Sequence, residues 1–225
     1  MSAASAISNE QTITLSGSTE VVTQFFEYSV NSILYQRGIY PPETFRRVSQ
    51  YGLAMMVTTD EGVSGYIHSI MAQLKTWLLH SAVQKLILVI KSIESGETLE
   101  RWAFDVSSPV TVDKANKPIM TKKSDSEITK EIQAIIRQIT ASVTFLPLLN
   151  EPCCFDLLVY ADKAAQVPVT WDDSDPCLIL GGERVALRSF NTTIHNIGTS
   201  VSYRISSKLQ ITPFEVILPI LLIET

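Results

Sequence analysis

The sequence predicts an α+β fold in which three long helices pack on one face of a mainly antiparallel sheet. Apolar residues recur with a period of about 3.6 in three separate segments, which is typical of amphipathic helices. Elsewhere the pattern changes to short runs rich in β-branched residues and bounded by turn residues. Hydrophobic residues are 45% of the 225 residues and charged residues 18%, so the chain has enough apolar side chains for a core. Helices and strands in mixed order favour the α+β class.

The first helix is predicted to follow residues 16–19, whose side chains favour helix capping, and to end before Gly38 and the prolines at 41–42. Its apolar stripe consists of Val21, Val22, Phe25, Phe26, Val30, Ile33 and Leu34. A second helix is predicted to begin near Asp60, whose carboxylate accepts hydrogen bonds from free backbone amides. The second stripe consists of Val63, Tyr66, Ile67, Ile70, Met71, Leu74, Trp77 and Leu78.

The strands come mostly after the second helix. Residues 85–90 are nearly all apolar, as expected of a central strand that is covered on both faces. The turn residues at 94–97 separate this run from residues 99–106, and the two runs are predicted to form a hairpin. Later strands are predicted at 155–160, 177–180, 185–193 and 200–205.

The third helix is predicted by its start signal. Ser124 and Glu127 have the spacing of a capping box, in which each side chain satisfies a backbone amide of the other residue. The stripe that follows consists of Ile128, Ile132, Ile135, Ile136, Ile139 and Val143, and Pro147 is predicted to close the helix. The polar residues 107–123 before this helix are predicted to be a mobile loop.

The charge and the two ends of the chain exclude several classes of protein. A net charge of −5 argues against a general nucleic-acid binder or a polybasic membrane reader. The N-terminus lacks the pattern of a secretory signal, and Cys153, Cys154 and Cys177 form no disulfide framework, so reduced thiols in the cytosol or nucleus are expected. The apolar run at 214–223 is shorter than the about 20 residues that a membrane span needs.

The search for an active site indicates no enzyme. Glycine-rich phosphate-binding motifs are absent, and the sequence around Ser64 falls short of a nucleophile elbow. His68 and His80 lie about 120° apart around one helix, so they cannot share a metal. The acidic run at 172–175 is interpreted as a solvated turn, and His195 as a half-buried structural residue in a late strand. No cofactor or metal is therefore expected, and an unpaired sheet edge that accepts a strand from a partner is the simplest binding site.

Several long strings of residues carry a resemblance to a known family. They are residues 32–41 (SILYQRGIYP), 93–97 (IESGE), 99–102 (LERW), 136–149 (IRQITASVTFLPLL), 155–160 (FDLLVY), 167–171 (VPVTW) and 187–195 (LRSFNTTIH). In this order, from about residue 13 to residue 203, the chain resembles the HORMA-domain proteins of the spindle-assembly checkpoint, the mitotic arrest deficient two family. The resemblance implies a HORMA domain over 13–205, with a flexible N-terminus at 1–12.

The resemblance also implies how such a protein works. Residues 162–205 would form a mobile "safety belt" with open and closed arrangements, which clamps a short peptide against the sheet. The implied partners are the activator subunit of the anaphase-promoting complex, a kinetochore checkpoint scaffold and a second copy of the chain in the other conformer. A checkpoint kinase-containing inhibitory complex and an ATP-driven HORMA remodeller complete the set, in the nucleus, at kinetochores and in the cytoplasm. Clamping the activator would delay anaphase.

Roles for individual residues follow from the same resemblance, position by position. The implied conformer-dimerisation surface consists of Arg137, Gln138, Phe145 and Arg188. The implied peptide-binding edge consists of Phe155, Leu157, Val159 and Tyr160. The residues implied in belt and conformer packing are Trp77, Trp171, His195 and Tyr203, and the last two match positions in the final strands of the belt.

Two alternatives remain open from the sequence. The first is another HORMA adaptor, which serves translesion polymerase assembly or the meiotic chromosome axis. The second is a membrane-peripheral or self-blocked protein governed by residues 206–225, an apolar extension beyond the point where the family ends. That extension would be a lineage-specific cover for an exposed edge, the product of an alternative transcript, or a gene-model artefact.

Overall fold

The structure, a computed structural model, describes residues 13–108 and 123–205. The predictions for residues 1–12, for nearly all of the loop at 107–123 and for residues 206–225 lie outside the described residues. The helices are α1 (Leu15–Gln36), α2 (Glu61–Leu79) and α3 (Asp125–Ala141), with short 3-10 turns at Pro42–Thr44 and Ser142–Thr144. The strands are β1 (Phe45–Gln50), β2 (Leu53–Thr58), β3 (Val83–Ser92), β4 (Thr98–Ser107), β5 (Cys153–Ala161), β6 (Glu183–Ala186), β7 (Phe190–Asn191) and β8 (Asn196–Tyr203).

The predicted start signals of α2 and α3 are confirmed. The Asp60 carboxylate accepts a hydrogen bond from the Val63 amide at 2.9 Å, and Ser124 and Glu127 form the complete capping box. The predicted caps of α1 are wrong, because Thr14 caps the helix by accepting from the Gly17 amide at 3.1 Å. Ser18 and Thr19 of the predicted capping run instead lie buried inside the helix.

The end of α3 also differs from the prediction. The helix stops at Ala141 and continues as a 3-10 turn through Thr144, so Pro147 does not itself close it. This tightening of the last turn rotates Val143 off the buried stripe, and its side chain is 37% exposed.

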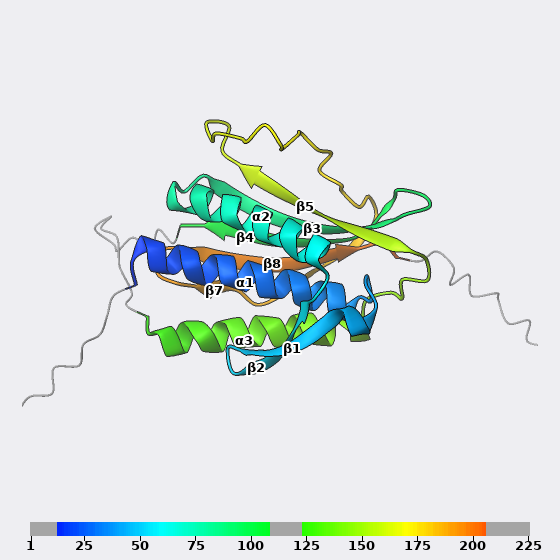
Figure 1. Ribbon diagram of the computed structural model, residues 1–225, viewed down its shortest axis with the longest axis horizontal. Helices are drawn as coiled ribbons and strands as arrows, with labels where there is room; N and C mark the ends of the chain where they lie inside the picture. Colours follow the sequence, from blue (N-terminus) through cyan, green and yellow to red (C-terminus); the bar gives the residue numbers. More distant parts are fainter. Residues whose placement is uncertain (1–12, 109–122, 206–225) are drawn as a thin grey trace, which may run out of the picture.

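Six strands form one sheet in the order β5-β3-β4-β8-β6, with β7 paired beside β8. Every pairing is antiparallel, and the predicted hairpin of β3 and β4 is confirmed, with Leu88 opposite Trp102. The helices α2, α1 and α3 lie side by side over one face of this sheet, with α1 in the middle (Figure 1). The predicted α+β architecture is therefore confirmed.

The core lies between the helical layer and the sheet. Phe25 and Phe26 of α1 pack against Phe104 of β4, with ring centroids 5.8 and 5.6 Å apart, and Phe190 lies 4.8 Å from Phe25. All four rings are at most 1% exposed. Burying an aromatic side chain removes 150–250 Å² of surface from water, so this cluster makes a large contribution to holding the α1 layer on the sheet.

Three strand predictions are corrected. A separate hairpin, β1–β2, occupies residues 45–58, to which no strand was assigned, and its turn places Tyr51 and Gly52 at positive φ. The predicted strand at 185–193 is split into β6 and β7, and β8 begins at Asn196, earlier than predicted. The apolar run at 177–180 is not a strand, because it passes over the face of the sheet and pairs with no strand of the described residues. Leu178 and Leu180 are 61% and 91% exposed.

Residues 162–182, called here the crossing segment, connect the two edges of the sheet. The segment leaves the end of β5 at one edge and reaches β6 at the other edge. On its way, Cys177 packs on Ile87, Val89 and Ala103, which lie on the face opposite the helices. Among the described residues, no helix is long and apolar enough to cross a membrane.

Candidate functional site

A groove of about 760 Å³ lies between α2, the strand β5 and the crossing segment. Tyr66, Ser69 and Ile70 line it from α2, residues 156–161 from β5, and residues 170–176 from the crossing segment. The crossing segment starts at the end of β5 and returns over the opposite face of the sheet, so it bounds the groove on its outer side. Residues 170–176 of the crossing segment therefore form one wall of the groove.

The floor of the groove is an unpaired sheet edge. Among the strands of the described residues, β5 ends the sheet and pairs with β3 alone. Just before β5, the Pro152 carbonyl accepts a hydrogen bond from the Ile93 amide, which follows β3. Just after β5, the Asp162 amide donates to the Ala82 carbonyl, which precedes β3. Backbone N–H and C=O groups point to alternate sides along a strand. In β5 these groups therefore point toward β3 at even-numbered residues and away from the sheet at odd-numbered residues.

This alternation divides the predicted peptide-binding edge. Phe155, Leu157 and Val159 present their N–H and C=O groups outward, where an added strand would bond to them. Tyr160 has its backbone toward β3, opposite Lys85, and contributes a side chain to the lining of the groove. The Phe155 ring packs edge to face with the rings of Tyr40 and Tyr66, with centroids 6.1 and 5.7 Å apart. The contact with Tyr66 holds the first half of α2 on the strand.

The groove is negatively charged. Asp156, Asp172, Asp173 and Asp175 line it, and its lining within the described residues includes no lysine, arginine or histidine. Carboxylates gathered along a cleft attract cations and disfavour anions. The acidic run interpreted as a solvated turn is indeed exposed, and it also forms one wall of this groove.

Two tryptophans fasten the start of the crossing segment to α2. The rings of Trp77 and Trp171 pack edge to face with centroids 5.0 Å apart. The Trp77 indole N–H also donates to the Gln166 carbonyl at 3.0 Å. Trp77 is only 5% exposed, so its contacts with the crossing segment are desolvated.

Cys177 fastens the far end of the crossing segment. Its side chain is 7% exposed, and its backbone, at φ 51°, is held by the Asp175 carboxylate, which accepts from the Cys177 amide at 2.6 Å. The adjacent Pro176 carbonyl accepts from Arg101 Nε of β4 at 3.1 Å. The segment is thus held to the sheet by one buried side chain and by the hydrogen bond from Arg101 to the residue before it.

The burial of Cys177 predicts a difference in thiol reactivity. In the native protein, Cys154 is exposed and is expected to react with iodoacetamide about tenfold or more faster than Cys177, whose thiol becomes accessible only when the crossing segment lifts. Peptide mapping by mass spectrometry over a time course measures both rates. Equal rates in the native protein, with both thiols equally reactive in denaturant, would show that the segment does not hold Cys177 against the sheet.

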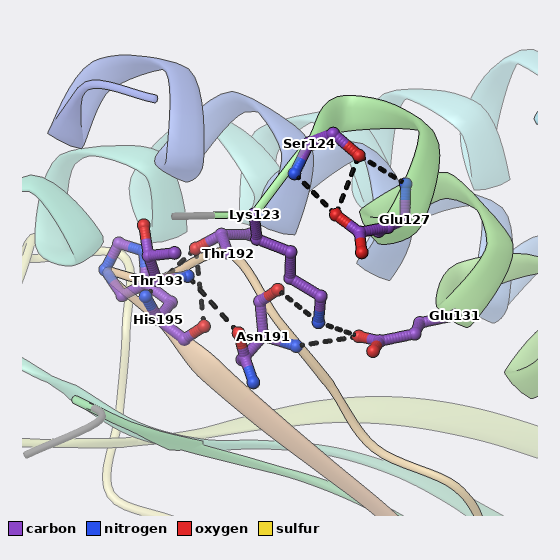
Figure 2. Close-up of polar contacts among 8 residues, drawn as sticks. All are labelled: Lys123, Ser124, Glu127, Glu131, Asn191, Thr192, Thr193 and His195. Carbon is purple, nitrogen blue, oxygen red and sulfur yellow. Dashed lines mark hydrogen bonds and ion pairs between the residues drawn. The ribbon is translucent and has the colours of Figure 1, made fainter. Parts of the chain in front are cut away.

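The turn between β7 and β8 contacts α1 and α2 through His195 and α3 through Asn191, and Figure 2 shows the contacts on the α3 side. His195 lies in this turn and not in a strand as predicted, and at 3% exposed it is fully buried. Its Nδ1 is 2.7 Å from the Ser18 hydroxyl of α1, and Thr192 bonds to both residues. Burial lowers the pKa of His195, while a hydrogen bond to the Leu78 carbonyl of α2 opposes that shift. His195 is therefore neutral at pH 7 and joins α1, α2 and the turn.

The third helix holds the same turn through charged groups (Figure 2). Lys123 pairs with Glu131 of α3, and its Nζ also donates to the Asn191 carbonyl at 3.2 Å. The Glu131 carboxylate accepts from the Asn191 amide at 3.3 Å. These contacts tie residues 190–195 to the helical layer in the arrangement that the structure describes.

The predicted dimerisation residues lie on α3, after the 3-10 turn that follows it, and between β6 and β7. The Gln138 side-chain oxygen accepts from the Arg188 amide at 2.7 Å, so the structure brings these two residues together. Phe145 is 42% exposed, and its ring lies 6.3 Å from that of Tyr203 in β8. Arg137 and Arg188 are both exposed.

A buried ion pair joins α1 to the sheet below this surface. Arg37 Nε donates to Glu100 Oε1 at 2.8 Å, and Arg37 Nη2 donates to the Pro147 carbonyl at 2.5 Å. The Trp102 indole N–H donates to Glu100 Oε2 at 3.1 Å. Burial raises the pKa of Glu100 and the Arg37 guanidinium opposes that shift.

Sequence reasoning missed three polar residues of these sites. Asp156 interrupts the apolar run at 155–160, and this interruption is a signal that points to the groove. Tyr66 was assigned to the apolar stripe of its helix, although its hydroxyl bonds to Asp156 at 2.9 Å. Ser18 gave no signal, because its partner His195 is distant in the sequence. In the described part of the chain, no group of three or more His, Cys, Asp or Glu residues could hold a metal ion.

Comparisons with known proteins give one consistent result. The HORMA domain matches residues 18–195. The chain is 53% identical over 199 residues to the mitotic spindle assembly checkpoint protein MAD2A of Homo sapiens, covering 88% of this chain and 96% of that protein. MAD2A of Dictyostelium discoideum is 52% identical over 202 residues, with coverages of 90% and 98%. A chain in a crystal structure of a mitotic checkpoint complex is 51% identical, with a TM-score of 0.77, and the match covers 84% of this chain and 99% of that one.

Proposed function

The chain belongs to the HORMA-domain family, and from this premise we propose that it is a mitotic spindle-assembly checkpoint adaptor that clamps a short peptide of its partner. The observation that carries the proposal is the unpaired edge of β5 at the floor of a groove that has the crossing segment as one wall. A peptide that adds a strand to this edge gains main-chain hydrogen bonds, and the segment covers it. The similarity to checkpoint proteins supports an adaptor and not an enzyme.

The proposed partners are the activator subunit of the anaphase-promoting complex and a kinetochore checkpoint scaffold. The similarity to a chain of a mitotic checkpoint complex supports this choice. The same similarity and the half-identical checkpoint relatives do not favour translesion or meiotic-axis adaptors. We place the protein at kinetochores, in the nucleus and in the cytoplasm, within a kinase-containing inhibitory complex that an ATP-driven remodeller resets.

The site residues keep the roles that the family resemblance implied. Phe155, Leu157 and Val159 provide the edge for the peptide, and Tyr160 contributes a side chain to the lining of the groove. Trp77, Trp171, His195 and Tyr203 hold the belt in the closed arrangement, which their packing supports. A surface formed by Arg137, Gln138, Phe145 and Arg188 recruits a second copy in the other conformer. Residues 13–205 form the HORMA domain, with 162–205 as the belt and 206–225 as an extension.

Peptide capture tests the proposal. A fluorescent peptide that carries the belt-binding segment of the activator is expected to bind slowly and tightly, because the belt must detach before the peptide enters. Fluorescence anisotropy gives both rates, for the full chain and for a chain that ends at Ile205. Binding by the shorter chain alone would mean that residues 206–225 block closure. Absence of binding by both folded chains would contradict the checkpoint function.

The acidic lining of the groove favours a peptide with basic residues. Replacing Asp172 and Asp173 together by asparagine is expected to weaken a basic activator peptide about three- to tenfold at low salt, because each exposed pair contributes up to about 1 kcal/mol. The effect should shrink in 0.5 M salt as the charges are screened. The matched control is Asp125→Asn at the start of α3, away from the groove. An equal loss in the control, or none at low salt, would show that the carboxylates do not attract the peptide.

A further inference from the structure

The outward amide of Leu157 is occupied, although none of the described strands pairs with β5 on that side. The Tyr66 hydroxyl accepts a hydrogen bond from the Leu157 amide at 3.2 Å, and Asp156 Oδ1 accepts from the same amide at 3.1 Å. The Tyr66 hydroxyl in turn donates to Asp156 Oδ1 at 2.9 Å. Two side chains therefore share the donor at the centre of the strand edge.

The ring of Tyr66 is placed so that its hydroxyl must reach this point. The ring packs edge to face on Phe155, with centroids 5.7 Å apart, and the side chain remains 36% exposed in the groove. Burial raises the pKa of Tyr66 to about 12, helped by the hydrogen bond to Asp156 and its charge and opposed by the hydrogen bond from the Leu157 amide. The hydroxyl therefore keeps its proton and can donate to Asp156 at neutral pH. The contact of the ring with Phe155 and two hydrogen bonds therefore hold the hydroxyl in place.

Val159 provides the internal comparison. Its backbone groups face outward from the same edge, and it also lines the groove. Among the hydrogen bonds of the described residues, no side chain accepts from the Val159 amide, whereas two accept from Leu157. The edge is therefore shielded at one residue and open at the next outward position.

We propose that Tyr66 is a placeholder for the peptide: its hydroxyl occupies the Leu157 amide while the groove is empty and yields that donor to a carbonyl of the captured strand. Exposed strand edges pair with other chains unless something blunts them. A side chain that accepts from the Leu157 amide makes the edge less prone to pair with unrelated chains. The captured peptide must then replace this hydrogen bond with one from its own carbonyl. The inference deepens the proposed function and depends on it for the identity of the ligand.

Tyr66→Phe removes the hydroxyl and keeps the ring on Phe155. The variant is expected to bind the activator peptide about two- to tenfold more tightly, which is the range of one neutral hydrogen bond, with most of the gain in the association rate. The matched control is Tyr40→Phe, because Tyr40 also packs on Phe155, at 6.1 Å, and its hydroxyl forms no hydrogen bond to β5 among the described residues. The control is expected to bind like the wild type.

Amide hydrogen exchange of the free chain gives a readout that needs no peptide. The Leu157 amide is expected to exchange more slowly than the Val159 amide in the wild type, and about two- to tenfold faster in Tyr66→Phe than in the wild type. A merely structural role of the hydroxyl would change melting temperature and many amides together.

Each outcome decides the inference. Unchanged exchange at Leu157 in Tyr66→Phe would overturn it, as would weaker peptide binding by this variant, which would make the hydroxyl a group that holds the bound peptide. If neither the wild type nor the variants bind the peptide, the proposed function fails. The exchange data then still decide whether Tyr66 shields the edge.

Discussion

Arg37→Met is expected to lower the free energy of unfolding by about 3–5 kcal/mol, because it leaves the Glu100 carboxylate buried without its counter-charge. The two side chains are only 5% and 2% exposed, so water does not replace the lost partner. The variant also leaves the Pro147 carbonyl without the donor that ties the segment after α3 to α1. Urea unfolding followed by circular dichroism measures the loss.

The same pair sets the direction of the pH dependence. Burial raises the pKa of Glu100 above its ordinary value of 4.5, so the stability that this group contributes is fully present below 4.5 and is lost as the pH rises through the folded-state pKa. Removal of Arg37 removes the opposing charge and raises that pKa further. The difference in stability between Arg37→Met and the wild type is therefore expected to be smaller near pH 4 than at pH 7.

A double variant controls for the loss of packing. Arg37→Met combined with Glu100→Gln leaves no buried charge and keeps an oxygen for the Trp102 indole, so it is expected to recover much of the lost stability. A double variant as unstable as Arg37→Met alone would show that packing, and not the unpaired carboxylate, causes the loss.

Arg137→Glu is expected to abolish conformer dimerisation and to leave peptide capture intact, if α3 carries the proposed dimer surface. Arginine is enriched among the residues whose loss costs an interface 2 kcal/mol or more, so the dimer should weaken by about thirtyfold or more. Arg137 is exposed, and its replacement leaves the contact of Gln138 with the Arg188 amide in place. Sedimentation velocity on mixtures of peptide-bound and peptide-free chain measures the dimer.

The control for this prediction lies on the same helix. Lys130→Glu makes the same change of charge at an exposed residue two turns before Arg137 and is expected to leave the dimer unchanged. Loss of peptide capture together with the dimer in Arg137→Glu would contradict the separate roles assigned to the two surfaces.

Local chemistry predicted those elements whose signals lie close together in the sequence. The cap at Asp60 and the capping box of Ser124 and Glu127 act over three residues, so α2 and α3 could be placed from the sequence. The run at 177–180 has the composition of a strand, but pairing requires a neighbouring strand. The run instead crosses the face of the sheet, where Cys177 packs while Leu178 and Leu180 stay exposed. Composition cannot distinguish these two surroundings.

The sequence predicted the strand edge of the candidate site but not the groove above it. The edge at 155–160 followed from its apolar run together with the family resemblance, and the groove above it did not, because Tyr66 and Asp156 meet over a distance of 90 residues in the sequence. His195 was predicted in a strand from its apolar neighbours. Its place in a turn depends on Ser18 and Thr192, which only the folded chain brings together.

The path of the crossing segment has a consequence for the lifetime of any complex. The segment is covalently continuous with β5 at one end and with β6 at the other, and Cys177 holds it against the sheet between them. A peptide in the groove that continues into folded domains on both sides is then interlocked, like a rod through a ring, and cannot slide out. Its escape requires the ring to open, so the residence time is set by the detachment of the segment. Ligands of very different affinity would then leave at nearly the same rate.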